Sequence, residues 1–286
     1  MDVLYYWRPD NYRADRQFGF GYHLNQNSPL LKELQAGDHV WAFTRRRSDG
    51  AYVLAADLVV VAVTENRPGF RYGRYRVWGD LQRSRYFDVD LGPDFEPVVR
   101  ALSVAAAARH LGQSFQGHAA VRRLSPADGA WLAQLAAQLP TLTAAAIYPE
   151  DRFEAALLHG IEDVEGLLRA ESGDEAALRR RYLYEAVDRT RSRAIIKQLY
   201  DEYEGRCQVC GVNPGSRYRV DLAEGHHLIW LSRGGEDTRD NVAILCPNHH
   251  AAVHRAPAVF DFRTLSFLFP NGVVEPLTLN HHLRAG

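Results

Sequence analysis

Short apolar stretches separated by turn-forming residues fill the chain between residues 1 and 91. Runs of this length between turn signals are typical of β-strands. The breaks are clear at Ser48-Asp49-Gly50 and Arg67-Pro68-Gly69, which are typical of tight turns. Several short strands around one inserted helix predict a small β-barrel. The predicted strands are Val3–Trp7, His39–Thr44, Ala51–Val63, Tyr72–Trp78 and Tyr86–Leu91.

Helical patterns interrupt and follow these strands. Ser28 stands directly before a proline, which is a typical helix start because the serine can cap free N–H groups and proline suits the first turn. Ser125 repeats this start, with Asp128 in the first turn. The segment from Ser114 to Leu124 predicts a last strand that returns to the barrel. The predicted helices are Pro29–Gln35, Phe95–Leu111 and Ser125–Leu139.

The rest of the chain divides into a helical stretch and a mixed C-terminal region. Residues 150–204 predict two or three helices, and a strand is expected at 224–228 before a helix that begins near Pro247. The strands Val259–Phe262 and Leu265–Phe269, with a turn at 270–272, predict a closing hairpin. We therefore expect an α+β protein with a first domain at 1–140, a helical linker at 141–204 and a C-terminal domain at 205–286.

Composition limits the class of protein. With 286 residues and 46% hydrophobic content, the chain can build two domains of ordinary size. It has no apolar run of 18 residues and no basic-then-apolar N-terminal signal, so we expect a soluble, cytoplasmic protein without a membrane partner. The formal net charge is −1, so attraction to nucleic acid must come from local basic patches.

All three cysteines and five of the twelve histidines lie between residues 207 and 254. Cys207 and Cys210 form a C-x2-C pair, and Cys246 and His249 form a C-x2-H pair further along. A closed tetrahedral zinc site takes four such ligands, and the second pair supplies the two that a lone C-x2-C lacks. A cytosolic C-x2-C is also compatible with a redox pair, or with two small buried apolar residues. We predict structural Zn²⁺, with cysteines kept reduced.

The remaining histidines of this region form a second candidate site. His250 and His254 are four residues apart, so on a helix they share one face and can bind one metal. His226 and His227 are adjacent in a predicted strand and project to opposite sides, so one can bind the metal while the other faces a substrate water. Asn241 follows a Gly-Gly loop, where its amide could hold the base imidazole by its far nitrogen.

Three motifs accompany the C-x2-C pair: EGHHL at 224–228, GGEDTRDN at 234–241 and LCPNHHAAVH at 245–254. In this combination the chain resembles the HNH, or ββα-metal, nuclease family, specifically its zinc-knuckle members. The resemblance implies that His227 is the general base and that Asn241 orients it. It also implies that His226, His250 and His254 bind a catalytic divalent ion, Mg²⁺ or another such as Mn²⁺, Ni²⁺ or Co²⁺. The chain departs from many zinc-knuckle relatives, which have cysteine at the position of His249 and lack the second histidine of the H-x3-H ending.

A basic run lies just before this region, where a predicted helix leads into it. A solvated helix face is one interpretation of such a run. Contact with the phosphate backbone of DNA is the other, because the run directly precedes the nuclease-like motifs. The candidate DNA-binding residues are Arg189, Arg191, Arg193 and Lys197.

Aromatic residues are concentrated in the first domain, with 16 of the 31 in the chain lying between Tyr5 and Phe87. A β-barrel core uses many aromatics, so most of them are expected to be structural. An aromatic excess interleaved with arginine also describes a pocket that stacks a flipped base. The segment Leu31-x2-Leu34-x2-Gly37-Asp38-x-Val40-Trp41-x-Phe43 is similar to the helix-to-strand step of PUA-like domains of the EVE kind, whose relatives read modified bases. The candidate pocket residues are Trp7, Phe20, Trp41 and Trp78.

These features predict a metal-dependent DNA endonuclease whose N-terminal domain selects the substrate. An HNH unit joined to a PUA-like reader is similar to a modification-dependent restriction enzyme, which implies foreign double-stranded DNA carrying a modified cytosine, such as 5-methylcytosine. A non-catalytic zinc module and a nuclease with an N-terminal protein-interaction domain, of toxin or mobile-element type, are the alternatives. The histidines and asparagine beyond the four predicted zinc ligands argue against the first of these. Because one active site must cut two strands, we expect a homodimer.

Overall fold

A computed structural model of the chain describes residues 1–18, 20–117, 120–142 and 189–285. The chain forms two compact units. The first unit comprises Met1–Val63 and Arg71–Ala145, and the second comprises Thr64–Phe70 and Ala146–Gly286. Most of the predicted helical linker, residues 143–188, lies outside the described residues. Among the described helices, none has the length and apolar character needed to cross a membrane.

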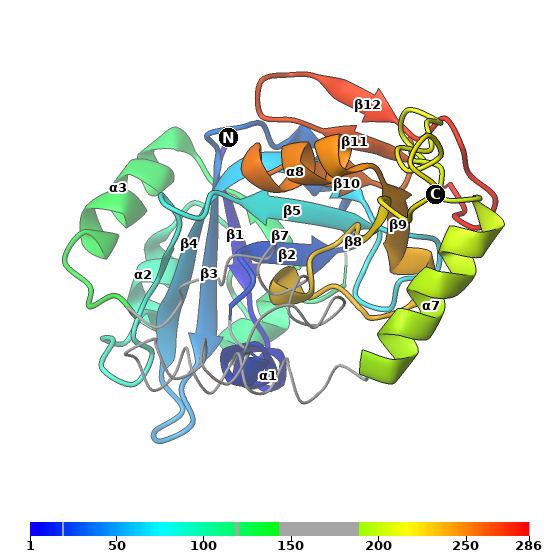
Figure 1. Ribbon diagram of the computed structural model, residues 1–286. Helices are drawn as coiled ribbons and strands as arrows, with labels where there is room; N and C mark the ends of the chain where they lie inside the picture. The colour runs from blue at the N-terminus through cyan, green and yellow to red at the C-terminus, as the bar shows by residue number, and fades with distance from the viewer. Residues whose placement is uncertain (19, 118–119, 143–188, 286) are drawn as a thin grey trace. The chain divides into compact units, whose positions relative to one another are not determined.

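The first unit is built on a seven-stranded sheet in the order β2-β5-β4-β3-β1-β7, with β6 paired to β4. β1 and β3 are parallel, whereas β1–β7, β3–β4 and β2–β5 are antiparallel. Figure 1 shows β5 running across the direction of β3 and β4, so the sheet is strongly curled. The strands are β1 (Val3–Tyr6), β2 (His23–Gln26), β3 (His39–Arg45), β4 (Tyr52–Glu65), β5 (Tyr75–Gly79), β6 (Arg85–Tyr86) and β7 (Val121–Arg123).

The predicted small barrel is present only in part: the sheet is mixed and curls into a half-barrel. Within the described residues β2 and β7 end the ladder and are not paired with each other. A closed barrel needs a continuous ring of paired strands. The two end strands, β2 and β7, are short and span four and three residues. The architecture is therefore a mixed α+β fold with a curled half-barrel sheet.

The helices of the first unit follow the predicted patterns only in part. α3 (Pro126–Ala136) begins with the predicted capping box, in which the Ser125 hydroxyl accepts the Asp128 N–H. Ser28 lies at the start of η1 (Pro29–Glu33), but η1 is a 3₁₀ helix and the serine side chain makes no capping hydrogen bond. α1 (Pro9–Phe18) and β2 have no counterpart among the predicted elements.

The predicted long helix at Phe95–Leu111 is wrong for most of its length. The structure has only α2 (Glu96–Ala101), and the chain is then irregular until η2 (Leu111–Phe115). Tertiary hydrogen bonds replace the helical ones here. The Ser103 N–H donates to the Asp128 carboxylate, and the Arg100 guanidinium donates to the Ala106 and Ala108 carbonyls. Alanine content favours a helix only weakly, so such contacts override it.

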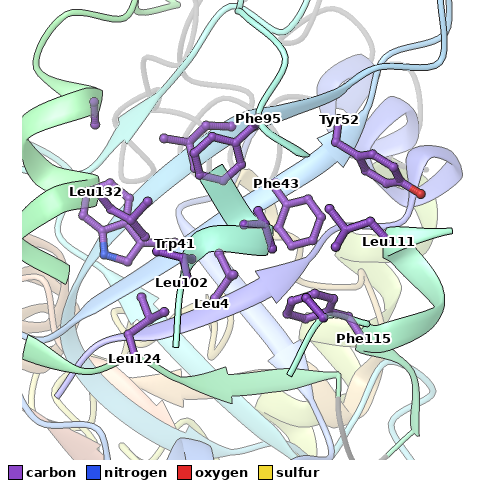
Figure 2. Close-up of a cluster of buried hydrophobic side chains, with 14 of the residues drawn as sticks. Leu4, Trp41, Phe43, Tyr52, Phe95, Leu102, Leu111, Phe115, Leu124 and Leu132 are labelled. Atoms are coloured by element: carbon purple, nitrogen blue, oxygen red, sulfur yellow. The ribbon is translucent and has the colours of Figure 1, made fainter. Parts of the chain in front are cut away.

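A hydrophobic core covers one side of the sheet (Figure 2). Trp41 and Phe43 of β3 lie at its centre and are 0% exposed. Side chains from the segments after β6 pack against them and remove this apolar surface from water. The main members of the core are Leu4, Trp41, Phe43, Tyr52, Phe95, Leu102, Leu111, Phe115, Leu124 and Leu132.

A second cluster of aromatic rings gathers around Trp7. Its ring centroid lies 5.1 Å from that of Tyr12 and 5.6 Å from that of Phe20, and Phe20 stacks on Tyr86 at 4.2 Å. The Trp7 Nε1–H donates to Asp15 Oδ2 at 3.0 Å. Burial raises the pKa of Asp15 to about 6, although the Trp7 hydrogen bond lowers it. This cluster therefore contains a carboxyl group that titrates near neutral pH.

The second unit contains a two-stranded β8–β9 sheet followed by a helix and a three-stranded sheet. β8 and β9 are antiparallel, with His226 opposite Ala243 and His227 opposite Val242. α7 packs on these strands through Leu199 and Tyr203. The elements are α7 (Arg189–Glu202), β8 (Glu224–His227), η5 (Leu231–Arg233), η6 (Arg239–Asn241), β9 (Val242–Leu245), α8 (Pro247–Arg255), β10 (Val259–Asp261), β11 (Ser266–Leu268) and β12 (Val274–Pro276).

The C-terminal hairpin is confirmed and extended. β10 and β11 pair with Phe260 opposite Phe267, as the predicted hairpin requires. The predicted turn at 270–272 leads into a third strand, β12, which pairs with β11. Gly272 has a φ of 86°, a backbone conformation that glycine adopts at no steric cost.

We expect Asp15→Asn to change the pH dependence of stability. Asparagine keeps an oxygen that can accept the Trp7 Nε1–H but does not titrate. The pKa of Asp15 is 3.8 ordinarily and about 6 in the folded protein, so between these pH values the folded wild type binds more protons than the unfolded chain. The Asp15 contribution to the free energy of unfolding therefore falls as the pH rises through this window. The variant should therefore gain more in melting temperature at about pH 7.5 than at about pH 5. Asp10→Asn, at an exposed position of α1, is the control, and a pH-independent gain for Asp15→Asn contradicts the prediction.

Candidate active site and metal centre

The two predicted metal-binding pairs meet in the second unit. One ligand atom from each of Cys207, Cys210, Cys246 and His249 lies within 4.8 Å of all the others. His249 Nδ1 is 3.1 Å from Cys246 Sγ and 3.5 Å from Cys207 Sγ. Ligands of a tetrahedral zinc ion lie about 3.4–3.8 Å from one another, given Zn–S and Zn–N bonds of about 2.3 and 2.1 Å. The four side chains therefore fit a zinc ion with small adjustments.

Local structure presents these ligands from two places. Cys207 and Cys210 lie in the turn after α7, and Cys246 is the N-cap of α8. Pro247 occupies the first turn of α8, as predicted, so His249 points from the start of a defined helix. Gln208 is completely buried between the cysteines, and its Oε1 accepts the Ile244 N–H at 2.8 Å, which ties the first pair to β9.

The electrostatics of Cys207 argue against a redox-active thiol. Burial raises the pKa of this thiol to about 12, because a thiolate is poorly solvated there. A redox-active C-x2-C cysteine has a lowered pKa. A bound zinc ion supplies the positive charge that keeps thiolates deprotonated in such a place.

The three predicted ligands of the catalytic ion also come together. His226 Nδ1 and His250 Nε2 each lie 3.2 Å from His254 Nε2. Nitrogen ligands at about 2.1 Å from one ion are about 3.0–3.4 Å apart, so the arrangement fits a shared divalent ion. His226 comes from β8, and the other two come from successive turns of α8. The prediction that His250 and His254 share a helix face is confirmed.

Close packing behind β8 positions His226. Gly225 precedes it, and a Cβ atom at Gly225 would lie 2.6 Å from Ile196 Cγ1 of α7. The absence of a side chain lets α7 lie directly against the strand. The Trp230 ring centroid is 5.5 Å from that of His254, and the Phe267 centroid is 5.9 Å from that of His226. These rings form an apolar wall around the three imidazoles.

His227 points to the other side of β8. Its Nε2 lies 3.1 Å from Asp237 Oδ1, in the loop between β8 and β9. Both His226 and His227 are 1% exposed. An ionised carboxylate only accepts hydrogen bonds, so in this contact the imidazole donates its Nε2–H. A carboxylate partner of this kind fixes the ring orientation and increases its basicity.

Asn241 supports this arrangement differently from the prediction. Its side-chain Oδ1 accepts the Ile229 N–H at 2.9 Å, and its Nδ2 donates to the carbonyls of Ile229 and Glu236. The Asn241 carbonyl accepts the Leu228 N–H. The expected hydrogen bond from the Asn241 amide to the His227 imidazole is therefore not formed. Asn241 instead holds the backbone that directly follows His227, because the loop returns alongside β8.

Residues 207–256 match the HNH endonuclease family. The chain carries an HNH endonuclease domain. The match spans the β8–β9 hairpin, α8 and both ligand clusters, so the nuclease domain expected from the motifs is confirmed.

Matches to individual proteins cover a short part of the chain or have low TM-scores. The chain is 40% identical over 62 residues to the Type IV methyl-directed restriction enzyme EcoKMcrA of Escherichia coli (strain K12), a match that covers 20% of this chain and 21% of that relative. The Modification dependent TagI restriction endonuclease has a TM-score of 0.25 and 14% identity, over 91% of this chain and 65% of that one. The Type IV phosphorothioation-dependent restriction endonuclease ScoMcrA has a TM-score of 0.21 and 16% identity, over 87% and 50%. TM-scores this low do not show a shared fold.

Sequence reasoning missed two acidic residues of the HNH domain. Glu224 Oε2 lies 2.6 Å from His250 Nδ1, and Asp237 contacts His227 as described above. A carboxylate on the far nitrogen of a metal-binding histidine orients the ring and increases its basicity. Glu224 precedes the histidine pair by one glycine, a signal that could have been used. Asp237 lies in a loop rich in acidic residues, where no spacing rule distinguishes it.

The predicted DNA-binding residues all belong to α7. Arg193 and Lys197 are exposed, and Lys197 Nζ lies 3.3 Å from Asp201 Oδ2. The side chains of Arg189 and Arg191 lie outside the described part of the chain. Both interpretations of the basic run, a solvated face and a DNA contact, stay predictions.

The predicted pocket aromatics do not gather in one place. Trp7 and Phe20 contact each other in the second ring cluster of the first unit, and Trp7 is half-buried. Trp41 is a correction, because it is 0% exposed among the core residues of Figure 2 and leaves no face for a base. Trp78 is 2% exposed, and its ring lies under the Arg76 guanidinium at 4.6 Å. Only the side around Trp7 keeps a partly exposed ring.

Glu224→Gln should lower the affinity of the three-histidine cluster for a divalent ion by roughly 10–100-fold, because the amide no longer increases the basicity of His250. The measurement is calorimetric titration of the zinc-loaded protein with Mn²⁺. Glu275→Gln is the matched control, since its carboxylate lies 3.6 Å from His249 in the other cluster. Equal Mn²⁺ affinity in wild type and Glu224→Gln would remove this role.

Cys207→Ser should lose zinc and lower the thermal stability of the second unit, because metal binding here contributes folding free energy. Elemental analysis gives the metal content, and thermal unfolding monitored by circular dichroism gives the stability. A zinc-free Cys207→Ser protein that melts at the wild-type temperature contradicts a structural metal at this cluster.

Proposed function

We propose that the protein is a metal-dependent endonuclease that restricts foreign double-stranded DNA carrying a modified cytosine. The observation that carries the chemistry is the pair of histidines in β8: His226 joins His250 and His254, and His227 contacts Asp237 on the other side of the strand. One of the three ligands, His226, and the base, His227, are thus adjacent residues of one strand that project to opposite sides. The chain spans about a fifth of the length of the curated relative it matches, so activity and substrate are proposals for the whole protein.

In the proposed reaction His227 is the general base. Its Nδ1 lone pair takes a proton from a water, whose oxygen forms a bond to the scissile phosphorus. The bond from phosphorus to the 3′ oxygen breaks, and that oxygen leaves and takes up a proton from solvent. Asp237 accepts the Nε2–H and stabilises the imidazolium that forms. Asn241 keeps the backbone after His227 in place through its contacts with Ile229.

His226, His250 and His254 would hold the catalytic divalent ion, with Mg²⁺, Mn²⁺, Ni²⁺ and Co²⁺ as candidates. Bound there, such an ion would neutralise the phosphate charge and the leaving 3′ oxygen. Imidazole ligands suit the transition metals among these candidates better than Mg²⁺. Cys207, Cys210, Cys246 and His249 would hold a structural Zn²⁺ as a zinc knuckle.

DNA recognition divides between the two units in this proposal. Arg193 and Lys197 are exposed on α7, the helix that packs on the HNH strands, and with Arg189 and Arg191 they would contact phosphates. The first unit, as a PUA-like reader, would recognise the modified base around Trp7 and Phe20. The methyl-directed description of the relative supports a modified DNA substrate for the protein, but the 62 matched residues cover only 20% of the chain. Cutting of both strands would use two copies of the chain, as a homodimer.

We expect His227→Ala to lower DNA cleavage by roughly 10²–10⁴-fold while zinc content and folding stay unchanged, because the base is not a metal ligand. The assay compares plasmids with unmodified, methylated and hydroxymethylated cytosine. Wild-type protein should cut at least one modified plasmid faster than the unmodified one. Cleavage by His227→Ala at the wild-type rate would disprove the role of the base.

The same inactive variant tests the recognition step. Full-length His227→Ala should bind duplex DNA with modified cytosine more tightly than the matched plain duplex. Adding Trp7→Ala to this variant should remove most of the difference, because stacking on an aromatic ring contributes about 1–3 kcal/mol per base. Fluorescence anisotropy measures both affinities. Equal binding of modified and plain DNA would favour a protein-interaction role for the first unit.

A further inference from the structure

The loop between β8 and β9 carries both Asp237 and Asn241, and its residues 235–240 are only half-buried. Its side chains are held from three directions. The buried Asn241 side chain forms hydrogen bonds with the Ile229 backbone and the Glu236 carbonyl. Arg239 forms an ion pair with Glu202 of α7. The third contact comes from a distant part of the sequence.

That third contact is made by Arg67. This residue lies in the segment Thr64–Phe70, here called the strap, which belongs to the second unit although β4 leads into it. Its two terminal guanidinium nitrogens form ion pairs with Glu236 and Asp240. One planar cation therefore bridges the two carboxylates on either side of Asp237, a geometry suited to the forked donors of arginine.

The strap is itself firmly attached. The Glu65 N–H donates to Asp261 Oδ1 at 2.9 Å, and the Phe262 N–H donates to the Glu65 carbonyl at 3.1 Å. Thr64, Glu65 and Asn66 are at most 7% exposed. The strap just before Arg67 is thus anchored to the Asp261 side chain of β10 and to the Phe262 backbone, so the backbone that carries Arg67 is held in place next to the loop.

We propose that Arg67 is a positioning residue for the general base, acting through the loop 236–241. By holding Glu236 and Asp240 it keeps Asp237 against His227 and Asn241 against Ile229. Its own ion pairs are partly exposed, with side-chain exposures of 30%, 38% and 43% for Arg67, Glu236 and Asp240, so they contribute little to global stability. Loss of these ion pairs should therefore change the placement of His227 rather than global stability. This inference rests on the proposed role of His227.

The test uses the full chain with Arg67→Ala, Arg67→Lys and the control Arg263→Ala. Arg263 pairs with Glu65 of the same strap at 3.9 Å but does not contact the loop. Arg67→Ala should lower kcat for plasmid cleavage about tenfold and leave KM within about twofold, because misplacement of a catalytic group affects the chemical step more than binding. Arg67→Lys, which can reach one carboxylate, should recover part of kcat. Arg263→Ala should match wild type.

A second measurement does not depend on activity. Hydrogen exchange followed by mass spectrometry reports on the Leu228 and Ile229 amides, which donate to Asn241. They should exchange faster in Arg67→Ala than in Arg263→Ala, with melting temperature and zinc content unchanged. Unchanged exchange overturns the inference, as does an unchanged or increased kcat. The plasmid is whichever one the wild type cuts, so loss of modification dependence affects only the proposed function. If the wild type cuts no DNA, the proposed function fails and hydrogen exchange alone decides whether Arg67 holds the loop.

Discussion

Both ligand clusters depend on one short helix. α8 has nine residues, and it supplies His249 to one cluster and His250 and His254 to the other, while Cys246 is its N-cap. A helix of this length does not hold its shape alone in water. It is held by packing of Val253, which is 1% exposed, by the first turn that Pro247 favours, and by the two clusters themselves. His249 and His250 are adjacent, so a rotation of α8 that suits one cluster moves the other. The two sites are therefore geometrically linked.

Carboxylates organise the imidazoles around this helix. Glu224 contacts His250, Asp237 contacts His227 and Glu275 lies near His249. In each case an acidic side chain approaches a ring nitrogen that is not directed at the ligand cluster or the substrate side. Such partners fix tautomers as well as orientations, which a buried imidazole needs because it cannot rely on water. The HNH domain thus contains an acidic outer layer, in which Glu224 and Asp237 lie within its sequence motifs and Glu275 lies beyond them.

The first unit shows how one composition serves two purposes. Trp41 and Phe43 fill the core on one side of the curled sheet, whereas Trp7, Tyr12, Phe20 and Tyr86 form a separate ring cluster with Asp15. Aromatic count alone could not separate these groups. Strand alternation separates them, because Tyr6 contacts Phe43 in the core while the next residue, Trp7, joins the other cluster.

The sequence by itself determined the elements whose signals are local. Ligand spacing predicted the two cysteine-containing pairs and the shared helix face of His250 and His254, and the family resemblance added His226. The capping pattern at Ser125 predicted α3, and apolar runs predicted β1, β3 and β4, because neighbouring residues decide these features. Tertiary structure decided the rest. The helix expected after Phe95 is cut short by contacts from Arg100 and Asp128, and the sheet curls into a half-barrel whose end strands, within the described residues, do not pair with each other. Asn241 contacts the backbone, whereas Asp237 contacts the His227 imidazole. Arg67 contacts Glu236 in the β8–β9 loop, which lies 169 residues away in sequence. Such contacts join residues that are distant along the chain, and no periodicity or spacing encodes them.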